Sequence, residues 1–153
     1  MRYFLLSAIL VVFIVSCKRD SSGNNGQKTD LTGTWMLTEV KDKSTGSTIS
    51  YPAGTQERIQ ITLRNDGSFG GNTRVNLFEG GTYTVPATGK ILFGSLGMMT
   101  KVAEDQLGTA FFTVLGACHL QSMSPCAPSS YSINGSTMII ASPLRYDIRF
   151  VKL

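Results

Sequence analysis

The sequence predicts a mainly β protein whose antiparallel strands form a sandwich or a barrel, accompanied by one helix. Short runs of alternating apolar and polar residues recur about every 8 to 12 residues after position 31, which is typical of such folds. The 16 glycines among 153 residues suit the many turns that these strands require. One segment, residues 104–115, shows helical spacing instead. Residues 31–153 are therefore expected to form a single domain.

Composition and charge narrow the class of protein. Hydrophobic residues make up 42% of the chain and charged residues 16%, which excludes a highly charged disordered protein. The 14 lysines and arginines exceed the 10 acidic residues, for a net charge of +4, but they are scattered, so no nucleic-acid partner is expected. One histidine and three cysteines leave little material for a metal site or a catalytic triad, and no cofactor is expected.

Residues 1–16 have the form of a bacterial signal peptide. Met1 and Arg2 give a short positive start, and residues 3–15 are an apolar run in which Ser7 is the one markedly polar member. A helix that spans a bilayer needs roughly 20 apolar residues, so this run is too short for a convincing membrane span.

The end of this segment, Ser16-Cys17, resembles a bacterial lipobox. The resemblance implies cleavage after Ser16 and acylation of Cys17, which would anchor the protein to the membrane through two or three acyl chains. An ordinary secretory signal with a chance cysteine is the alternative. The next residue is Lys18 rather than the Asp that favours inner-membrane retention in enteric lipoproteins. We therefore expect a lipid-anchored protein of the bacterial cell envelope, in the outer membrane.

Residues 17–30 are expected to form the lipidated N-terminus and a flexible tether. From Lys18 to Asp30 the chain contains no apolar side chain and is rich in Gly, Ser, Asn and charged residues. Thirteen residues reach at most about 45 Å when fully extended. The folded domain is therefore expected to lie near the membrane without needing to touch it.

The domain opens with a predicted strand at residues 33–40. Trp35 and Leu37 share one face, with Glu39 next in the same alternation, and Val40 belongs to the opposite face.

A second strand is predicted at residues 58–64, where Ile59, Ile61 and Leu63 point inward. Residues 65–67, Asn-Asp-Gly, form a predicted turn, because Asp-Gly tolerates the positive φ angles of tight hairpins. The next predicted strand begins at residue 75, is interrupted by Gly80-Gly81 and resumes, so that it covers residues 75–79 and 82–85. The remaining predicted strands are 90–93, 131–133, 138–141 and 146–153.

One helix is predicted over residues 104–115. Leu107, Phe111 and Val114 fall at helical spacing, and Gly116 is a suitable stop. Gly108 weakens the helix by up to about 1 kcal/mol. The helix is expected to pack against the sheet or to close one end of a barrel.

Several short motifs, in this order and spacing, resemble the META-domain family of HslJ-like envelope proteins. The opening Leu31-Thr-Gly-Thr-Trp35 resembles the start of that family, and residues 76–84 resemble its central Asn-x-Phe-x-Gly-x-Tyr motif with one extra residue. The resemblance implies a small antiparallel β-barrel with one helix, a location in the cell envelope and no established enzymatic activity. The motif residues, all given a structural role, are Gly33, Trp35, Asn76, Phe78, Gly80 and Tyr83.

Two departures from the family concern cysteine. Many members carry a cysteine at each of two positions that are Val75 and Glu104 here. This chain instead has Cys118 and Cys126, in an apparent insertion at residues 117–130. With Cys17 lipidated, an even pair remains in an oxidising compartment, and a disulfide is the simplest expectation. Free thiols and a metal site that includes His119 are the alternatives.

The sequence also contains candidates for other functions. The Gly-x-Trp opening also occurs in lipocalins, which carry a small apolar ligand inside the barrel, and this is the alternative function. Glu39, Glu79 and Glu104 are candidate carboxylates for glycoside hydrolysis, but no spacing selects a pair. Met98 and Met99 are candidates for contact with an apolar partner. The sequence therefore predicts a non-enzymatic protein with a structural, stress-related or partner-binding role.

Replacing the lipobox cysteine tests the anchor. Cys17→Ser is expected to abolish labelling by a radioactive fatty acid and to leave a soluble protein or an uncleaved precursor, because the acyl chains attach to that residue. Cell fractionation and labelling measure both effects. Lipid labelling that persists in the variant would refute the assignment.

Overall fold

The structure is a computed structural model that describes residues 31–121 and 126–153. The predicted signal peptide, the lipidation site Cys17 and the tether lie outside the described residues. Among the residues that are described, no helix combines the length and the apolar character needed to cross a bilayer.

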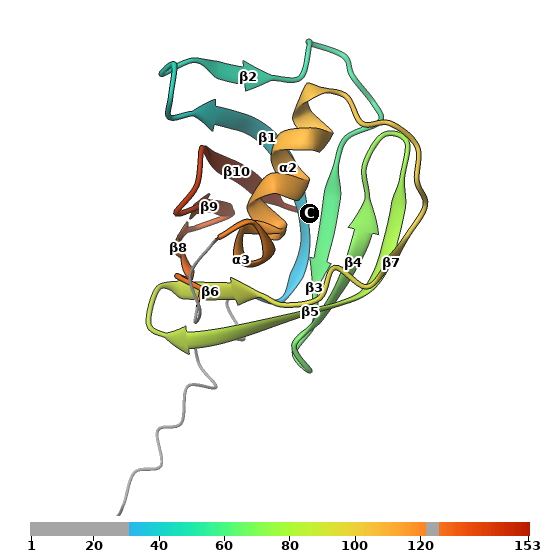
Figure 1. Cartoon of the computed structure of the whole chain (residues 1–153). Coiled ribbons are helices and arrows are strands. Elements are labelled where there is room, and N and C mark those ends of the chain that lie inside the picture. The colour runs from blue at the N-terminus through green and yellow to red at the C-terminus, as the bar shows by residue number, and fades with distance from the viewer. Residues whose placement is uncertain (1–30, 122–125) are drawn as a thin grey trace, which may run out of the picture.

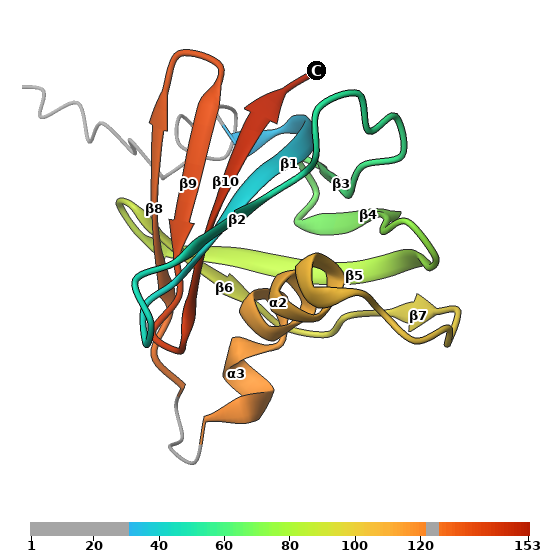
Figure 2. The ribbon, with the colours of Figure 1, turned by 90° about the horizontal axis from the view of Figure 1, so that it is seen from above.

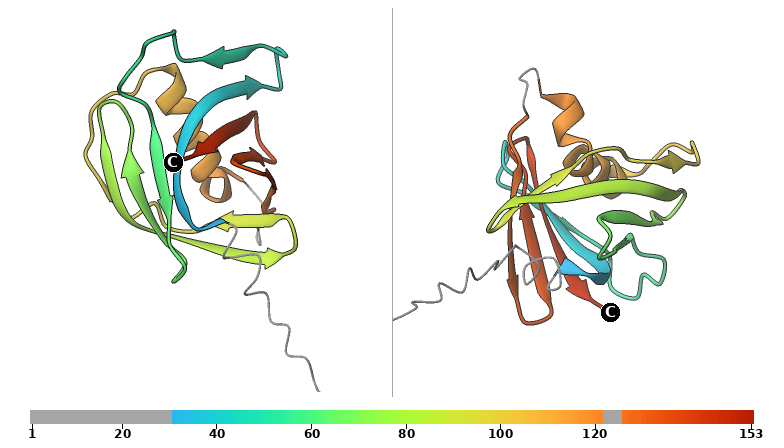
Figure 3. Two further views of the ribbon diagram at one scale, coloured as in Figure 1. Left: turned by 180° about the vertical axis from the view of Figure 1, so that it is seen from behind. Right: turned by 90° about the horizontal axis from the view of Figure 1, so that it is seen from below.

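Eight antiparallel strands close into a barrel in the order β1-β3-β4-β5-β6-β8-β9-β10, with β10 returning to pair with β1 (Figure 1). The C-terminal end of β10 lies beside β1 in the views from the front and from behind (Figures 1 and 3). Two short strands lie outside the ring: β2 pairs with β1, and β7 pairs with β5. The strands are β1 (Gly33–Asp42), β2 (Thr48–Ser50), β3 (Gln60–Leu63), β4 (Ser68–Asn72), β5 (Leu77–Ala87), β6 (Lys90–Phe93), β7 (Met98–Met99), β8 (Ser129–Asn134), β9 (Thr137–Ala141) and β10 (Tyr146–Lys152).

The mainly β fold predicted from the alternation is confirmed, with one correction in β1. Trp35 and Leu37 are fully buried as expected, but the third inward residue is Val40 and not Glu39. The register between β1 and β10 shifts between Leu37 and Glu39, so the inward positions move by one residue. Glu39 lies outside and forms an ion pair with Arg149 at 3.0 Å.

The interruption predicted at Gly80-Gly81 is wrong, because β5 runs through it without a break. Gly80 has a φ of 75°, and the register between β4 and β5 shifts beside it. The two glycines therefore form a bulge within one long strand. Gly81 also gives the Phe69 ring room: a Cβ there would lie 2.3 Å from the Phe69 Cζ atom.

Helix α2 (Gln106–Leu115) begins two residues later than predicted. Asp105 is its N-cap and accepts a hydrogen bond from the Gly108 backbone N–H at 2.8 Å. Glu104 lies outside the helix and points back across Gly108, where a Cβ would meet its Oε2 at 1.9 Å. Gly108 lowers the helix propensity of this segment, but the close approach of the Glu104 side chain requires a residue without a Cβ at this position. A short helix, α3 (Ala117–Leu120), follows.

Helix α2 lies across one end of the barrel, as Figure 2 shows from above. Phe111 enters the core, where its ring centroid lies 5.7 Å from that of Phe78 and 6.4 Å from that of Phe150. Phe69 continues this cluster, 5.4 Å from Phe93. Of the two placements expected for the helix, the structure shows the one that closes an end of the barrel, and aromatic side chains fill the interior.

Trp35 lies near the opposite end, as the third residue of β1, whose start is furthest from α2 in Figure 2. The side chain is fully buried, and its Nε1 donates a hydrogen bond to the Leu31 carbonyl at 2.7 Å. The Lys152 ammonium lies 5.1 Å from the ring centroid. The indole thus joins the chain before β1 to the barrel and to the last strand.

Truncating this side chain tests its role. Trp35→Ala is expected to reduce the free energy of unfolding by about 3 to 5 kcal/mol, because it empties a fully buried site. Urea unfolding followed by circular dichroism measures the change, and Trp35→Phe, which keeps an aromatic ring, is expected to lose less. A fluorescence maximum like that of indole in water, with unchanged unfolding of Trp35→Ala, would contradict burial.

Candidate functional site

The candidate functional residues lie on one rim of the barrel, where the β4–β5 connection meets the segment that leads from β7 into α2. We call residues 98–105, which form that segment, the strap. It contains both residues of β7 and ends at the N-cap of α2. Its geometry depends on Asn76, just before β5.

Asn76 is 3% exposed and uses its whole side-chain amide to hold the strap. Its Nδ2 donates to the Val102 carbonyl at 2.7 Å and to Glu104 Oε1 at 2.6 Å. Its Oδ1 accepts from the Val102 N–H at 2.8 Å and from the Thr100 hydroxyl at 2.9 Å. Two donors and two acceptor sites are thereby satisfied, which fixes the amide orientation.

Thr73 completes this connection. Its hydroxyl donates to Glu104 Oε1 at 2.7 Å and accepts from the Asn76 N–H at 2.9 Å. Val75 and Glu104, the positions at which many family members carry cysteine, belong to these same two segments. Hydrogen bonds to the Glu104 carboxylate therefore join the β4–β5 connection to the strap in this chain.

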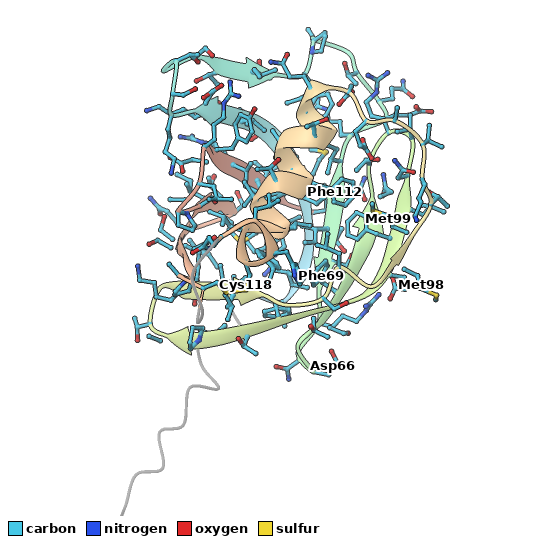
Figure 4. The ribbon with its side chains drawn as sticks, in the orientation of Figure 1. Asp66, Phe69, Met98, Met99, Phe112 and Cys118 are labelled. Carbon is cyan, nitrogen blue, oxygen red and sulfur yellow. A yellow bond between two sulfur atoms is a disulfide. The ribbon has the colours of Figure 1, made fainter. Side chains whose placement is uncertain are left out.

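The strap and the neighbouring residues around the start of β5 carry an apolar patch, defined as Val75, Leu77, Met98, Met99 and Val102. These are five of the seven large hydrophobic residues that are exposed in the described parts of the chain. Leu77, Met98 and Met99 line one shallow hollow. Leu77 is 66% exposed and Met98 is 83% exposed. Figure 4 labels Met98 and Met99 at this side of the barrel. An exposed cluster of this kind commonly marks an interaction surface.

Pairing between strands assembles the patch. Phe78 pairs with Met99 and Glu79 with Met98, and the Thr100 N–H donates to the Leu77 carbonyl at 3.0 Å. Sequence analysis identified only the two methionines. Val75, Leu77 and Val102 look like ordinary strand or loop residues in the sequence. The β5–β7 pairing brings Leu77 beside the methionines, and Asn76 holds Val102 next to the same segment.

A groove of about 340 Å³ adjoins the patch, between residues 56–60 and residues 72–77. Val75 and Leu77 belong to both features. The rest of the lining is polar or charged, and includes Arg58, Gln60 and Asn72. The sequence offered no signal for this groove, because its residues come from separate strands and loops.

The other motif residues serve the fold. Phe78 and Tyr83 are each 2% exposed, and the Tyr83 hydroxyl donates to the Arg64 carbonyl at 2.7 Å. Burial raises the pKa of Tyr83 above its ordinary value. Gly33 has a φ of 126°, which favours glycine.

The three candidate carboxylates occupy three different settings. Glu39 pairs with Arg149, and Glu79 pairs with Arg64 at 2.6 Å. Glu104 is held by Thr73 and Asn76. Each carboxylate thus has a separate structural partner, and this arrangement does not favour the acid–base pair that a glycosidase requires.

Cys118 and Cys126 form a disulfide with a Cα–Cα distance of 5.2 Å. His119 turns elsewhere: its Nε2 lies 2.9 Å from the Gly94 carbonyl oxygen. The cysteines and the histidine are therefore not arranged as the three ligands of a metal site. The disulfide closes a loop that leads from α3 toward β8.

The fold and the rim together define a small closed β-barrel, filled by its own helix, whose groove and apolar patch lie on its outer surface. The family model of the META domain matches residues 29–142, and the chain belongs to this family.

Two solved structures have the same fold. An NMR structure of a protein from Burkholderia xenovorans matches with a TM-score of 0.58 and 18% identity, over 100% of this chain and 99% of that chain. A crystal structure of a DUF4847 family protein from Bacteroides vulgatus matches with a TM-score of 0.53 and 14% identity, over 82% of this chain and 96% of that chain. No curated protein matches the sequence.

Removing the Asn76 amide tests whether this side chain joins the β4–β5 connection to the strap. Asn76→Ala is expected to cost about 2 to 3 kcal/mol of stability, because it removes four hydrogen bonds made by a side chain that is 3% exposed. Hydrogen exchange at Val102 is expected to accelerate more than exchange in β9. Asn65→Ala, at an exposed turn, is the control and is expected to change stability by less than about 0.5 kcal/mol. Equal effects of the two variants would contradict the assignment.

Alkylation tests the disulfide. Unreduced, denatured protein is expected to resist alkylation of Cys118 and Cys126 until a reductant is added, as measured by mass spectrometry. The Cys118→Ser, Cys126→Ser double variant is expected to lose roughly 2.5 kcal/mol of folding stability, the chain-entropy contribution of closing a loop of about nine residues. Prompt double alkylation without reductant would rule out the bond, and alkylation released by a chelator alone would indicate a metal.

Proposed function

We propose that this chain is a non-enzymatic, lipid-anchored protein of the bacterial cell envelope that binds a protein partner through the apolar patch. The signal-peptide pattern and the Ser16-Cys17 lipobox support export and anchoring, and Lys18 supports the outer membrane. The patch carries the proposal, because it concentrates most of the exposed large hydrophobic side chains at one rim.

Two further observations favour this function over the alternatives. A lipocalin-like carrier needs an apolar cavity of roughly 300 Å³ or more inside its barrel. Here Phe69, Phe78, Phe111 and Phe150 occupy the core. The three carboxylates weighed for hydrolysis are held in separate contacts. These contacts support a role that depends on the surface of the barrel.

Hydrogen bonding gives the patch a rigid base. The Asn76 side chain is hydrogen-bonded to both the N–H and the carbonyl of Val102. The Leu77 N–H donates to the Thr100 hydroxyl, and the Leu77 carbonyl accepts from the Thr100 N–H. A surface that is already ordered loses less conformational entropy on binding, which favours affinity. The proposed partner therefore presents an apolar surface to a preformed one.

Site-specific photocrosslinking in the native envelope tests the proposal. A photoreactive amino acid at Met98, in the full-length lipidated protein, is expected to give a protein adduct of defined mass. The same group at Ser132, an exposed residue of β8, is the matched control and is expected to give none. Leu77→Asp is expected to abolish the Met98 adduct while leaving circular dichroism unchanged, since Leu77 is exposed. Identical adducts at both positions, no adduct, or an adduct with lipid alone would contradict the proposal.

A further inference from the structure

The groove beside the patch contains an arginine whose charge has no acidic partner. Within residues 31–121 and 126–153, four of the five arginines pair with a carboxylate: Arg64 with Glu79, Arg74 with Asp105, Arg145 with Asp42 and Arg149 with Glu39. Arg58 is the fifth, and it lines the groove.

Two contacts hold the head group of Arg58. Its Nε donates to the Thr55 carbonyl at 3.0 Å, and its guanidinium carbon lies 5.8 Å from the centroid of the Tyr51 ring. Both contacts leave the two terminal nitrogens for another acceptor. A guanidinium presents these N–H groups as a planar fork that matches the two oxygens of a carboxylate.

The floor of the groove offers amide groups. Gln60 and Asn72 are register partners on β3 and β4, and Gln60 faces outward because Ile61 and Leu63 point into the core. Asn72 Nδ2 donates to the carbonyls of Arg58 and Thr73, which leaves its Oδ1 as an acceptor. Side chains of this type can pair with the N–H and carbonyl groups of a peptide backbone.

The far side of the groove is apolar. Leu77 pairs with Asn72, so Gln60, Asn72 and Leu77 follow one another across three strands. At a strand spacing of about 4.8 Å this row measures roughly 10 Å, which is the length of about three residues of extended chain. Arg58 lies two residues before Gln60 in the chain and lines the same groove. A ligand along this row therefore meets amides and an aliphatic side chain, with a cation beside the Gln60 end.

The charges around the groove favour a single negative group. Arg74 is neutralised by Asp105 at 3.1 Å, and the exposed Glu57 lines the same groove. A polyanion would bring uncompensated negative charge beside these carboxylates, whereas the single charge of one carboxylate is neutralised by Arg58. The lining therefore suits an ion with one charge.

We propose that this groove binds the free C-terminal carboxylate of an extended peptide that ends in an aliphatic residue. Arg58 binds the carboxylate, Gln60 and Asn72 bind backbone amides, and Leu77 contacts the aliphatic side chain. The assignment rests on the proposed function in one respect, because Val75 and Leu77 belong to both surfaces. It identifies the part of the partner that is recognised: its C-terminal end.

Nuclear magnetic resonance on the full-length, isotope-labelled protein in detergent micelles tests the assignment. The probe is the peptide acetyl-Ser-Gly-Ala-Leu with a free C-terminus, added to millimolar concentration, compared with the same peptide as a C-terminal amide. The free acid is expected to shift the backbone amides of residues 56–60 and 72–77 and to bind about tenfold more tightly than the amide, because a charge-assisted pair is lost in the amide.

Three variants make the result specific. Arg58→Gln is expected to weaken binding of the free acid about tenfold and to abolish the difference between acid and amide. Arg149→Gln, on β10, is the matched control and is expected to leave binding unchanged. Met99→Asp is expected to abolish the Met98 crosslink to the native partner but to leave peptide binding intact, since the exposed Met99 does not line the groove.

Several other results would overturn the assignment. Equal binding of acid and amide, shifts confined to other residues, or no shift at all would overturn the assignment while leaving the Met98 crosslink to judge the proposed function. Glucuronate that binds through Arg58 as tightly as the peptide would also overturn it, because the carboxylate would then belong to a sugar acid.

Discussion

The position of Phe111 inside one end of the barrel determines much of what the rest of the structure can do. Its contacts with Phe78 and Phe150 place helix α2 in the space that a carrier protein would reserve for its ligand. The approach to the helix is in turn held by the bonds from Asn76 to Val102 and Glu104. The same strap that leads into the filled interior carries Val102 and the methionines to the surface. Filling the barrel and building the apolar patch are two results of one arrangement.

The family motif and the candidate binding features are largely separate sets of residues. Trp35, Asn76 and Tyr83 are buried and use their polar atoms on backbone or strap groups. Arg58 and Met98, by contrast, lie on loops or at a sheet edge and have no part in the motif. One fold can carry different functions on different surface residues. In this chain the motif residues build the barrel, and the candidate binding features lie on its outer surface.

Sequence reasoning succeeded where side-chain direction is a local property, and failed where distant segments decide. The inward positions Ile61 and Leu63 follow from strict alternation, whereas the bulge that brings Val40 inward depends on pairing with β10. Strand β4 was missed because Gly70-Gly71 has low strand propensity, although the close approach of Phe78 requires the small residue at Gly71. Asn76 was recognised as a motif position, but its partners lie 24 to 28 residues away. The groove at Arg58 could not be found, since three strands build it.

The barrel closes through the pairing of its first and last strands, with Trp35 opposite Lys152 and Asp42 opposite Tyr146. Contacts between residues so far apart in sequence form slowly, on a scale of roughly milliseconds to seconds. Because the chain is synthesised from its N-terminus, β1 is made first and β10 last. One edge of β1 therefore stays unpaired until the seven residues of β10 have been synthesised and can pair with it. During that interval β1 is an open template on which another strand can add. Any cell that makes this protein must therefore keep the unfinished chain apart from its copies, and a truncation of only the last few residues would extend that hazard for the lifetime of the molecule.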